Sequence, residues 1–173
     1  MGSHKDVRRV KLYCPYCGSS LGRVQHDGRE RAYCKTCDTV DYDNPIPATA
    51  GLVLNDFRQL LLVRRGMEPG KGEWGLPGGF VEADESPETG VIREIQAETG
   101  LIVRPEQLVA VVYEDSAFYG PLIIIGYKVR PEGGVLRAGD DAVEARYFAI
   151  DELPRVAFPA HDSLIRELER LEE

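Results

Sequence analysis

The sequence predicts an α+β protein in which helices flank a mixed β-sheet as an α/β/α sandwich, preceded by a small cysteine-rich unit. Three observations carry this prediction. All four cysteines lie near the start of the chain, strand-like segments outnumber helix-like ones beyond them, and two segments carry helix signals. The proline-containing connector over residues 43–47 separates the two parts, which gives expected domains over residues 8–42 and 43–173.

The second domain contains five strand-like apolar segments and two helical ones. Strands are expected over residues 48–54, 59–64, 109–114, 122–129 and 145–149, the first two as a hairpin. Ser86 is a good N-cap, Pro87 suits the first helical position and Gly100 suits a left-handed C-cap, which predicts a helix over 87–99. A second helix is expected over 160–171, where leucines recur at helical spacing and His161 is a helix-start residue rather than a general base.

Charge and hydropathy exclude several classes of protein. The 173-residue chain has a formal net charge of −8, which disfavours a general nucleic-acid-binding protein, although residues 1–40 alone carry +4. No apolar run approaches the roughly 18 to 20 residues that a membrane span needs. The polar N-terminus is unlike a secretory signal. We therefore expect a cytoplasmic protein with no membrane partner, in which nucleic acid is an unlikely partner.

The cysteines form two C-x2-C pairs, Cys14 with Cys17 and Cys34 with Cys37, which are separated by sixteen residues. This spacing is typical of a tetrahedral site of four thiolates. The alternatives are two disulfides or four unrelated buried thiols, and a reducing compartment argues against disulfides. We expect a structural Zn²⁺ ion, because four thiolates leave no open position for water or substrate.

The residues around these pairs are those of a small ribbon. Gly18 follows the first pair, where a sharp turn needs positive φ, and Asp38 takes the same place after the second. Residues 21–24 and 31–33 are expected to form short strands joined at Asp27-Gly28, a strong hairpin dipeptide. So small a unit has little core, so the metal is expected to supply most of its folding free energy.

The predicted helix over 87–99 places Glu94 and Glu98 four residues apart, one turn above each other at the edge of its apolar face. Like charges at this spacing repel, and near a partly buried face a divalent cation such as Mg²⁺ would relieve the repulsion. Glu82 and Glu85 add carboxylates just before the helix, and Arg93 is placed to pair with Glu85. The alternative is an ordinary solvated acidic face, which the spacing alone does not exclude.

The order of residues in this stretch resembles the signature of the Nudix hydrolases, G-x5-E-x7-R-E-U-x-E-E-x-G-U with U apolar. Eight of nine fixed positions match over 23 residues: Gly79, Glu85, Arg93, Glu94, Ile95, Glu98, Gly100 and Leu101. One position departs, because Ala97 stands where the signature has the first glutamate of its pair, and Asp84 replaces a common glycine. The cysteine-rich unit joined to such a domain is similar to the subgroup that acts on NADH, FAD or ADP-ribose.

The resemblance implies a pyrophosphohydrolase of nucleoside diphosphates linked to another group. It implies that Glu94, Glu98 and the Gly78 carbonyl bind Mg²⁺ or Mn²⁺, that Glu85 and Arg93 form a supporting ion pair, and that Glu144 completes the metal site. Asp140 and Asp141 are weaker candidates for the role of Glu144. Since Ala97 cannot bind metal, one ion fewer is expected.

The substrate is less well defined than the reaction. The Ser-Gln-Pro-Trp-Pro-Phe-Pro pattern of NADH-specific relatives is absent. Glu82, Phe118 and Tyr119 are candidate substrate-binding residues, with the two aromatic rings able to stack on a base, although exposed loop aromatics more often only pack. A metabolite sensor without activity and a module that removes RNA 5′ caps are the alternative functions, and the resemblance allows a homodimer.

Overall fold

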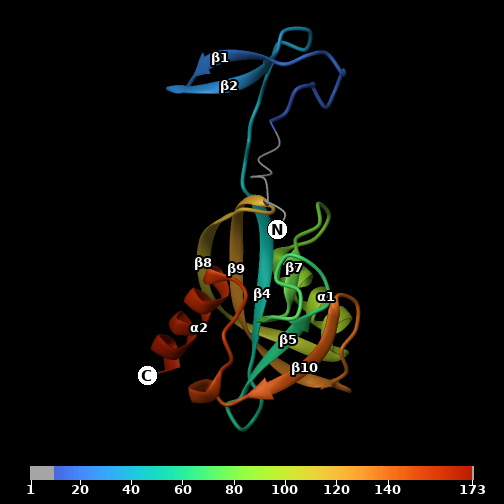
Figure 1. Ribbon diagram of the computed structural model, residues 1–173, viewed down its shortest axis with the longest axis vertical. Coiled ribbons are helices and arrows are strands. Elements are labelled where there is room, and N and C mark those ends of the chain that lie inside the picture. The colour runs from blue at the N-terminus through green and yellow to red at the C-terminus, as the bar shows by residue number, and fades with distance from the viewer. Residues whose placement is uncertain (1–9, 173) are drawn as a thin grey trace, which may run out of the picture. The chain divides into compact units, whose positions relative to one another are not determined.

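A computed structural model describes residues 10–172 of the chain (Figure 1). Residues 8 and 9 of the first expected domain and Glu173 of the second lie outside the described residues. The described chain falls into two compact units, the first comprising the residues up to Pro45 with Ala117–Gly120, and the second comprising Ile46–Ser116 with the residues from Pro121 onward. Neither of the two α-helices within residues 10–172 is long and apolar enough to cross a membrane.

The first unit is a three-stranded antiparallel ribbon in the order β1-β2-β3, formed by Gly22–His26, Arg29–Cys34 and Thr39–Asp41. Asp27 and Gly28 join the first two strands with φ values of 49° and 73°, so the predicted hairpin turn is present. Gly18 and Asp38 also adopt positive φ, 71° and 52°, at the ends of the two cysteine pairs. The third strand was not predicted, because three residues give too short a pattern.

The second unit contains two sheets. Strands Ile46–Val53 (β4), Gly78–Phe80 (β7), Leu101–Ser116 (β8) and Gly120–Gly134 (β9) form a sheet in the order β7-β4-β9-β8. Strands Leu60–Arg65 (β5), Trp74–Gly75 (β6) and Ala142–Phe148 (β10) form the other, in the order β10-β5-β6. β4 pairs in parallel with β9 over its whole length and antiparallel with β7.

The predicted hairpin of residues 48–54 with 59–64 is wrong in its pairing. Only one bridge, Leu54 with Leu60, joins the two segments, and β4 and β5 then enter different sheets. The reason is that β7 and β9 occupy both edges of β4, which leaves no edge for β5. A central position also explains why residues Ala48–Val53 are buried without polar alternation.

Helices Pro87–Thr99 (α1) and Pro159–Glu172 (α2) cover opposite faces of the β4-containing sheet. A Cβ added at Gly51 would lie 2.4 Å from Ile95 of α1, and one added at Gly126 would lie 2.4 Å from Leu164 of α2. Gly51 pairs with Tyr127 and Ala50 with Gly126, so the two glycines face opposite sides of the sheet. A 3₁₀ turn at Ile150–Glu152 precedes α2. The α/β/α sandwich predicted from the sequence is therefore confirmed.

The core between α1 and the sheets is built from aliphatic side chains and one tyrosine. Its buried members are Val53, Leu61, Val91, Ile95, Leu101, Val103, Tyr127 and Val129. Leu61 comes from the second sheet and Val91 and Ile95 from α1, so this core fixes the helix against both sheets. The position of the acidic edge of α1 is thereby set by apolar packing.

Candidate active site

The candidate site begins where β7 runs beside α1. The Gly78 N–H donates to a Glu98 carboxylate oxygen at 3.0 Å. Gly78 is required for the approach of β7 to β4, because an added Cβ would lie 2.1 Å from the Thr49 carbonyl oxygen. At Gly79 an added Cβ would lie 2.5 Å from a Glu94 carboxylate oxygen, so the absence of a side chain there leaves room for the Glu94 carboxylate beside the loop.

Glu98 is a carboxyl group in an environment that disfavours its charge. It is only 6% exposed, and burial, opposed by the Gly78 N–H and reinforced by the charge of Glu94, raises its pKa to about 8. Arg65 lowers this pKa and Asp141 raises it by smaller amounts. The carboxylate oxygens of Glu94 and Glu98 are the kind of negatively charged ligand that a hard divalent cation prefers. Such a cation would stabilise the ionised form of Glu98.

Arg93 joins the loop to the helix. Its guanidinium donates to Glu85 twice, at 3.0 and 2.6 Å, to Glu94 at 2.7 Å and to the Phe80 carbonyl at 3.1 Å. The Arg93 bonds, followed by a bond from the Glu82 N–H, lower the pKa of Glu85 to about 2. The expected Glu85–Arg93 ion pair is present, and the contact with Glu94 extends it to a residue expected to bind metal.

Glu144 is paired with arginines of β5 and β10. Glu144 forms ion pairs with Arg64 at 3.7 Å and with Arg146 at 4.0 Å. Its neighbour Ala145 packs on the core beneath α1, and successive residues of a strand face opposite sides, so Glu144 lies on the other face of its sheet. Asp141, just before β10, is the acidic residue of this segment whose charge acts on Glu98. The metal-binding roles of Glu144 and of Asp141 stay predictions.

The candidate substrate-binding residues lie in exposed turns. Glu82 is exposed in the loop before α1, where its backbone N–H donates to Glu85 at 2.9 Å. Phe118 and Tyr119 contact each other edge to face in the turn between β8 and β9, with ring centroids 4.9 Å apart. The roles of all three in substrate binding stay predictions.

Sequence reasoning did not single out Arg65, whose charge acts on Glu98. Arg65 ends β5, donates to the Pro69 carbonyl at 2.6 Å and lies 5.0 Å from the centre of the Phe158 ring. The sequence pattern that could have identified Arg65 is an arginine at the end of an apolar strand, directly before a glycine-rich loop. This pattern predicts that the arginine binds the loop, but it does not predict that the arginine lies near Glu98, which depends on the packing of α1.

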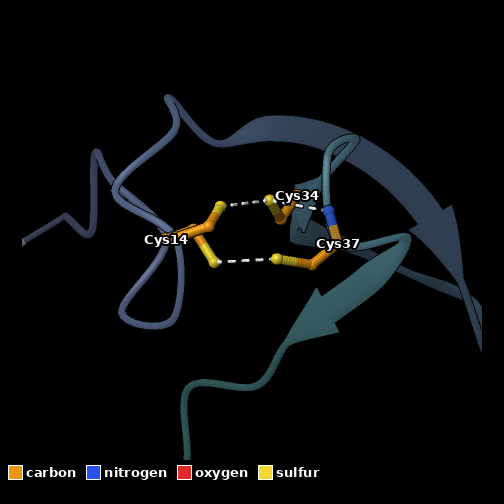
Figure 2. A group of neighbouring side chains, drawn as sticks. Cys14, Cys34 and Cys37 are labelled. Atoms are coloured by element: carbon orange, nitrogen blue, oxygen red, sulfur yellow. Dashed lines mark hydrogen bonds between the residues drawn. The ribbon is translucent and has the colours of Figure 1, made fainter.

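The four cysteine sulfurs converge in the first unit, as Figure 2 shows for Cys14, Cys34 and Cys37. All four lie within 4.8 Å of one another, with Cys14–Cys37 at 3.9 Å and Cys17–Cys34 at 3.5 Å. Four thiolates about 2.3 Å from a tetrahedral zinc ion would be about 3.8 Å apart, so the spacing fits this ion. The Cys37 N–H donates to the Cys34 sulfur at 3.4 Å. The cluster is consistent with the expected zinc ribbon.

Two of the thiols have shifted pKa values of opposite sign. Hydrogen bonds from the Ser19 side chain and then from its backbone lower the pKa of Cys17 to about 6, which favours the thiolate. Hydrogen bonding to Cys17 and then to Cys34 raises the pKa of Cys37 to about 12. A dication among the four sulfurs would favour the thiolate form of each of them.

A glycine loop against a helix with paired carboxylates defines the class of site that suits divalent cations and phosphate anhydrides. The NUDIX domain model matches residues 45–168, so the chain belongs to the Nudix family and is a Nudix hydrolase. An ADP-ribose pyrophosphatase from Methanocaldococcus jannaschii is 41% identical over 130 residues, which are 75% of this chain and 76% of that protein.

Two further similarities cover more of this chain. The NAD-capped RNA hydrolase NudC of Stutzerimonas stutzeri is 30% identical over 157 residues, 90% of this chain but 54% of that protein, so the chain spans about half of its length. The crystal structure of a NUDIX hydrolase from Nitrosomonas europaea matches with a TM-score of 0.80 at 27% identity, over 94% of this chain and 93% of that one. The similarity to this structure therefore extends over almost the whole chain.

Proposed function

We propose that this protein hydrolyses the diphosphate bond of a nucleoside diphosphate linked to a second group, with Mg²⁺ or Mn²⁺ bound at the acidic edge of α1. ADP-ribose is the first candidate substrate, followed by FAD and NAD(H). Water forms a bond to one phosphorus while the P–O–P bridge breaks, and the two phosphates of the products share the protons. From ADP-ribose this reaction gives AMP and ribose 5-phosphate.

The observation that carries this proposal is the buried Glu98 carboxyl, held by the Gly78 N–H beside Glu94. Glu94, Glu98 and the Gly78 carbonyl would hold the metal, with Asp141 or Glu144 as a further ligand. Bound there, the metal would neutralise the diphosphate and lower the pKa of the attacking water. Arg93 holds Glu85 and Glu94 in fixed orientations relative to the loop.

The ranking of substrates is supported by the relatives. The relative named for ADP-ribose is 41% identical and is covered over about three quarters of its length. The relatives named for NAD-capped RNA are less similar, and the chain spans about half of each. Whole-protein functions of those longer relatives are therefore weaker guides to the substrate of this chain.

A substrate panel tests the proposal. ADP-ribose, FAD, NADH and NAD-capped RNA are incubated with the protein and Mg²⁺ or Mn²⁺, and phosphate released by an added phosphatase is measured. We expect metal-dependent turnover that is fastest with ADP-ribose and is lost in Glu98→Gln. No turnover on any member with either metal would contradict the proposal.

A sensor that binds a nucleotide without cleaving it is the second candidate function. The observation that favours it is Ala97, a residue on the exposed surface of α1 that offers no metal ligand. Calorimetry with ADP-ribose followed by chromatography separates the two candidates, because a sensor returns its ligand intact. We also propose that the four-cysteine cluster binds a structural zinc ion.

A further inference from the structure

The segment that leads into α2 contacts the loop on which the candidate site is built. The Ala157 N–H donates to the Trp74 carbonyl at 2.7 Å, and Trp74 forms a β-bridge with Val156. Two residues along, the Leu76 N–H donates to the Nδ1 atom of His161 at 3.0 Å. The second contact is unusual because a side chain 85 residues away serves as the acceptor for a loop amide.

His161 is arranged to accept this bond. The imidazole is partly buried and lies edge to face on Phe158, with ring centroids 5.1 Å apart. The Gly75 backbone approaches so closely that an added Cβ would lie 3.2 Å from Nδ1. An imidazole nitrogen that accepts a hydrogen bond carries no proton, so the proton of the neutral ring lies on Nε2.

The charged groups around the ring favour this neutral form. Burial, with a smaller effect from the Arg65 charge, lowers the pKa of His161. Arg65 reaches the neighbouring Phe158 ring from β5, Glu114 of β8 accepts the Ala160 N–H at 2.9 Å, and Asp162 follows on α2 and pairs with Arg166. The acceptor role of Nδ1 is established by the hydrogen-bond geometry, and the pKa direction agrees with it.

The Leu76 bond is the first of three consecutive anchors. Leu76 is bound to His161, the Pro77 carbonyl accepts the Gly51 N–H of β4 at 2.8 Å, and the Gly78 N–H is bound to Glu98. Since Leu76 is only 3% exposed, its N–H would have little access to water if the acceptor were removed. Loss of the first anchor would therefore change the backbone that presents Gly78.

We propose that His161 is a positioning residue of the candidate active site: by accepting the Leu76 N–H it fixes the loop that holds Gly78 against Glu98. The claim that this positioning serves turnover rests on the proposed function. The claim that His161 positions the loop does not depend on it. The imidazole acts through the loop backbone and is assigned no contact with substrate.

Two substitutions at this position separate hydrogen bonding from packing. His161→Asn keeps an acceptor oxygen near the place of Nδ1, and His161→Leu keeps bulk without an acceptor. Ser163→Ala is the matched control, since the Ser163 hydroxyl donates to Pro159 within the same first turn of α2. Backbone amide exchange at Leu76 and Gly78 is measured by NMR in the full chain without added magnesium, manganese or nucleotide.

We expect exchange at both amides to accelerate about tenfold or more in His161→Leu and to stay near wild type in the other two variants. Unchanged exchange in a folded His161→Leu protein would overturn the proposal. So would equal acceleration in His161→Asn and His161→Leu, because it would mean that the ring only packs. If His161→Leu does not fold, the ¹⁵N chemical shifts of the wild-type His161 ring test the proposal instead. A protonated Nδ1 would overturn the proposal.

Activity adds a second measurement. His161→Leu is expected to lower kcat on ADP-ribose and raise the Mn²⁺ concentration for half-maximal rate about tenfold, with a smaller change in KM and rescue by His161→Asn. An equal loss in both variants would contradict positioning. Absence of turnover in the wild type would contradict the proposed function, and the amide exchange result would still test the role of His161.

Discussion

Glu98 combines burial with a negative charge that the proposed chemistry requires. In Glu98→Gln the Gly78 N–H keeps an acceptor, but the charge that would bind metal is removed. We expect turnover to fall at least about a hundredfold. The melting temperature without added magnesium or manganese should stay the same or rise, because on folding Glu98 must either take up a proton or bury its charge, whereas the neutral amide does neither. Parallel losses of turnover and melting temperature would instead indicate a structural role.

The raised pKa of Glu98 also predicts how stability depends on pH. Its pKa is 4.5 as the ordinary value and about 8 in the folded protein, so between these values the folded state binds more protons than the unfolded state. The contribution of Glu98 to stability without a bound divalent cation must therefore fall as pH rises through this window. His161, whose pKa is lowered, contributes in the opposite direction below about pH 6.5 in both proteins, so the melting temperature of the wild type should fall more, or rise less, from pH 5 to 8 than that of Glu98→Gln. Saturating Mn²⁺ should reduce the difference, and identical slopes in its absence would contradict the burial argument.

Ala97 is the residue at which the chain departs from the family signature. Because it is exposed on α1 one residue before Glu98, a longer side chain can be accommodated there. Ala97→Glu is expected to raise turnover or to lower the Mg²⁺ concentration for half-maximal rate by about threefold or more. Gln96→Glu adds the same charge to the neighbouring exposed position and should do neither. Equal effects in both variants would indicate a general electrostatic effect.

At the scale of elements, α1 is the part of the fold that the sequence predicted best. Its bounds were predicted as 87–99 and are Pro87–Thr99, because the signals are local: Ser86 accepts the Thr89 N–H and Gly100 has a φ of 69°. β8 was predicted over six residues and has sixteen, because it is an edge strand and its first half, with Arg104 and Glu106, lacks a simple apolar pattern. The capping signals of a helix lie in the residues next to its ends, whereas the extent of an edge strand depends on the strand with which it pairs.

In the candidate site, too, the residues that are close in the sequence were predicted better than those that are distant. Gly78, Glu85, Arg93, Glu94 and Glu98 lie within 21 residues, so one motif predicted that they would meet. Asp141 and His161 act on this group only because β10 and α2 fold back onto it. No periodicity reports such a long-range approach, and Glu144 and Asp141 were therefore candidates only through the resemblance to the family.

The loop before α1 depends on the fork geometry of Arg93. A lysine at this position has one ammonium group and cannot bind Glu85, Glu94 and the Phe80 carbonyl together. Arg93→Lys should therefore lower turnover about tenfold or more with little change in melting temperature, since the Arg93 side chain is 41% exposed. Arg104→Lys is the control, because Arg104 of β8 pairs with Glu106 of the same strand and with Glu132 of β9. Equal losses of turnover in the two variants would count against a specific role for the fork.

At the scale of the whole molecule, the two units differ in what stabilises them. The second unit has an extensive aliphatic core, whereas the buried apolar residues of the first, among those described, are Cys14, Ala32 and Cys34. Two of these three are proposed zinc ligands. A unit of this size without a metal is below the length at which a core alone is usually sufficient, and structural zinc contributes about 10 to 16 kcal/mol in comparable small domains.

Removal of zinc should therefore unfold the first unit and leave the second folded. We expect one zinc ion per chain by elemental analysis, and chelation followed by addition of Mg²⁺ should abolish amide protection in peptides from residues 10–45. Peptides from β4 and α1 should keep their protection, because the core that holds them contains no cysteine. Cys17→Ser should reproduce the loss without chelator, and added zinc should restore protection only in the wild type. Simultaneous loss of protection in both units would mean that the zinc site stabilises the whole chain rather than the ribbon.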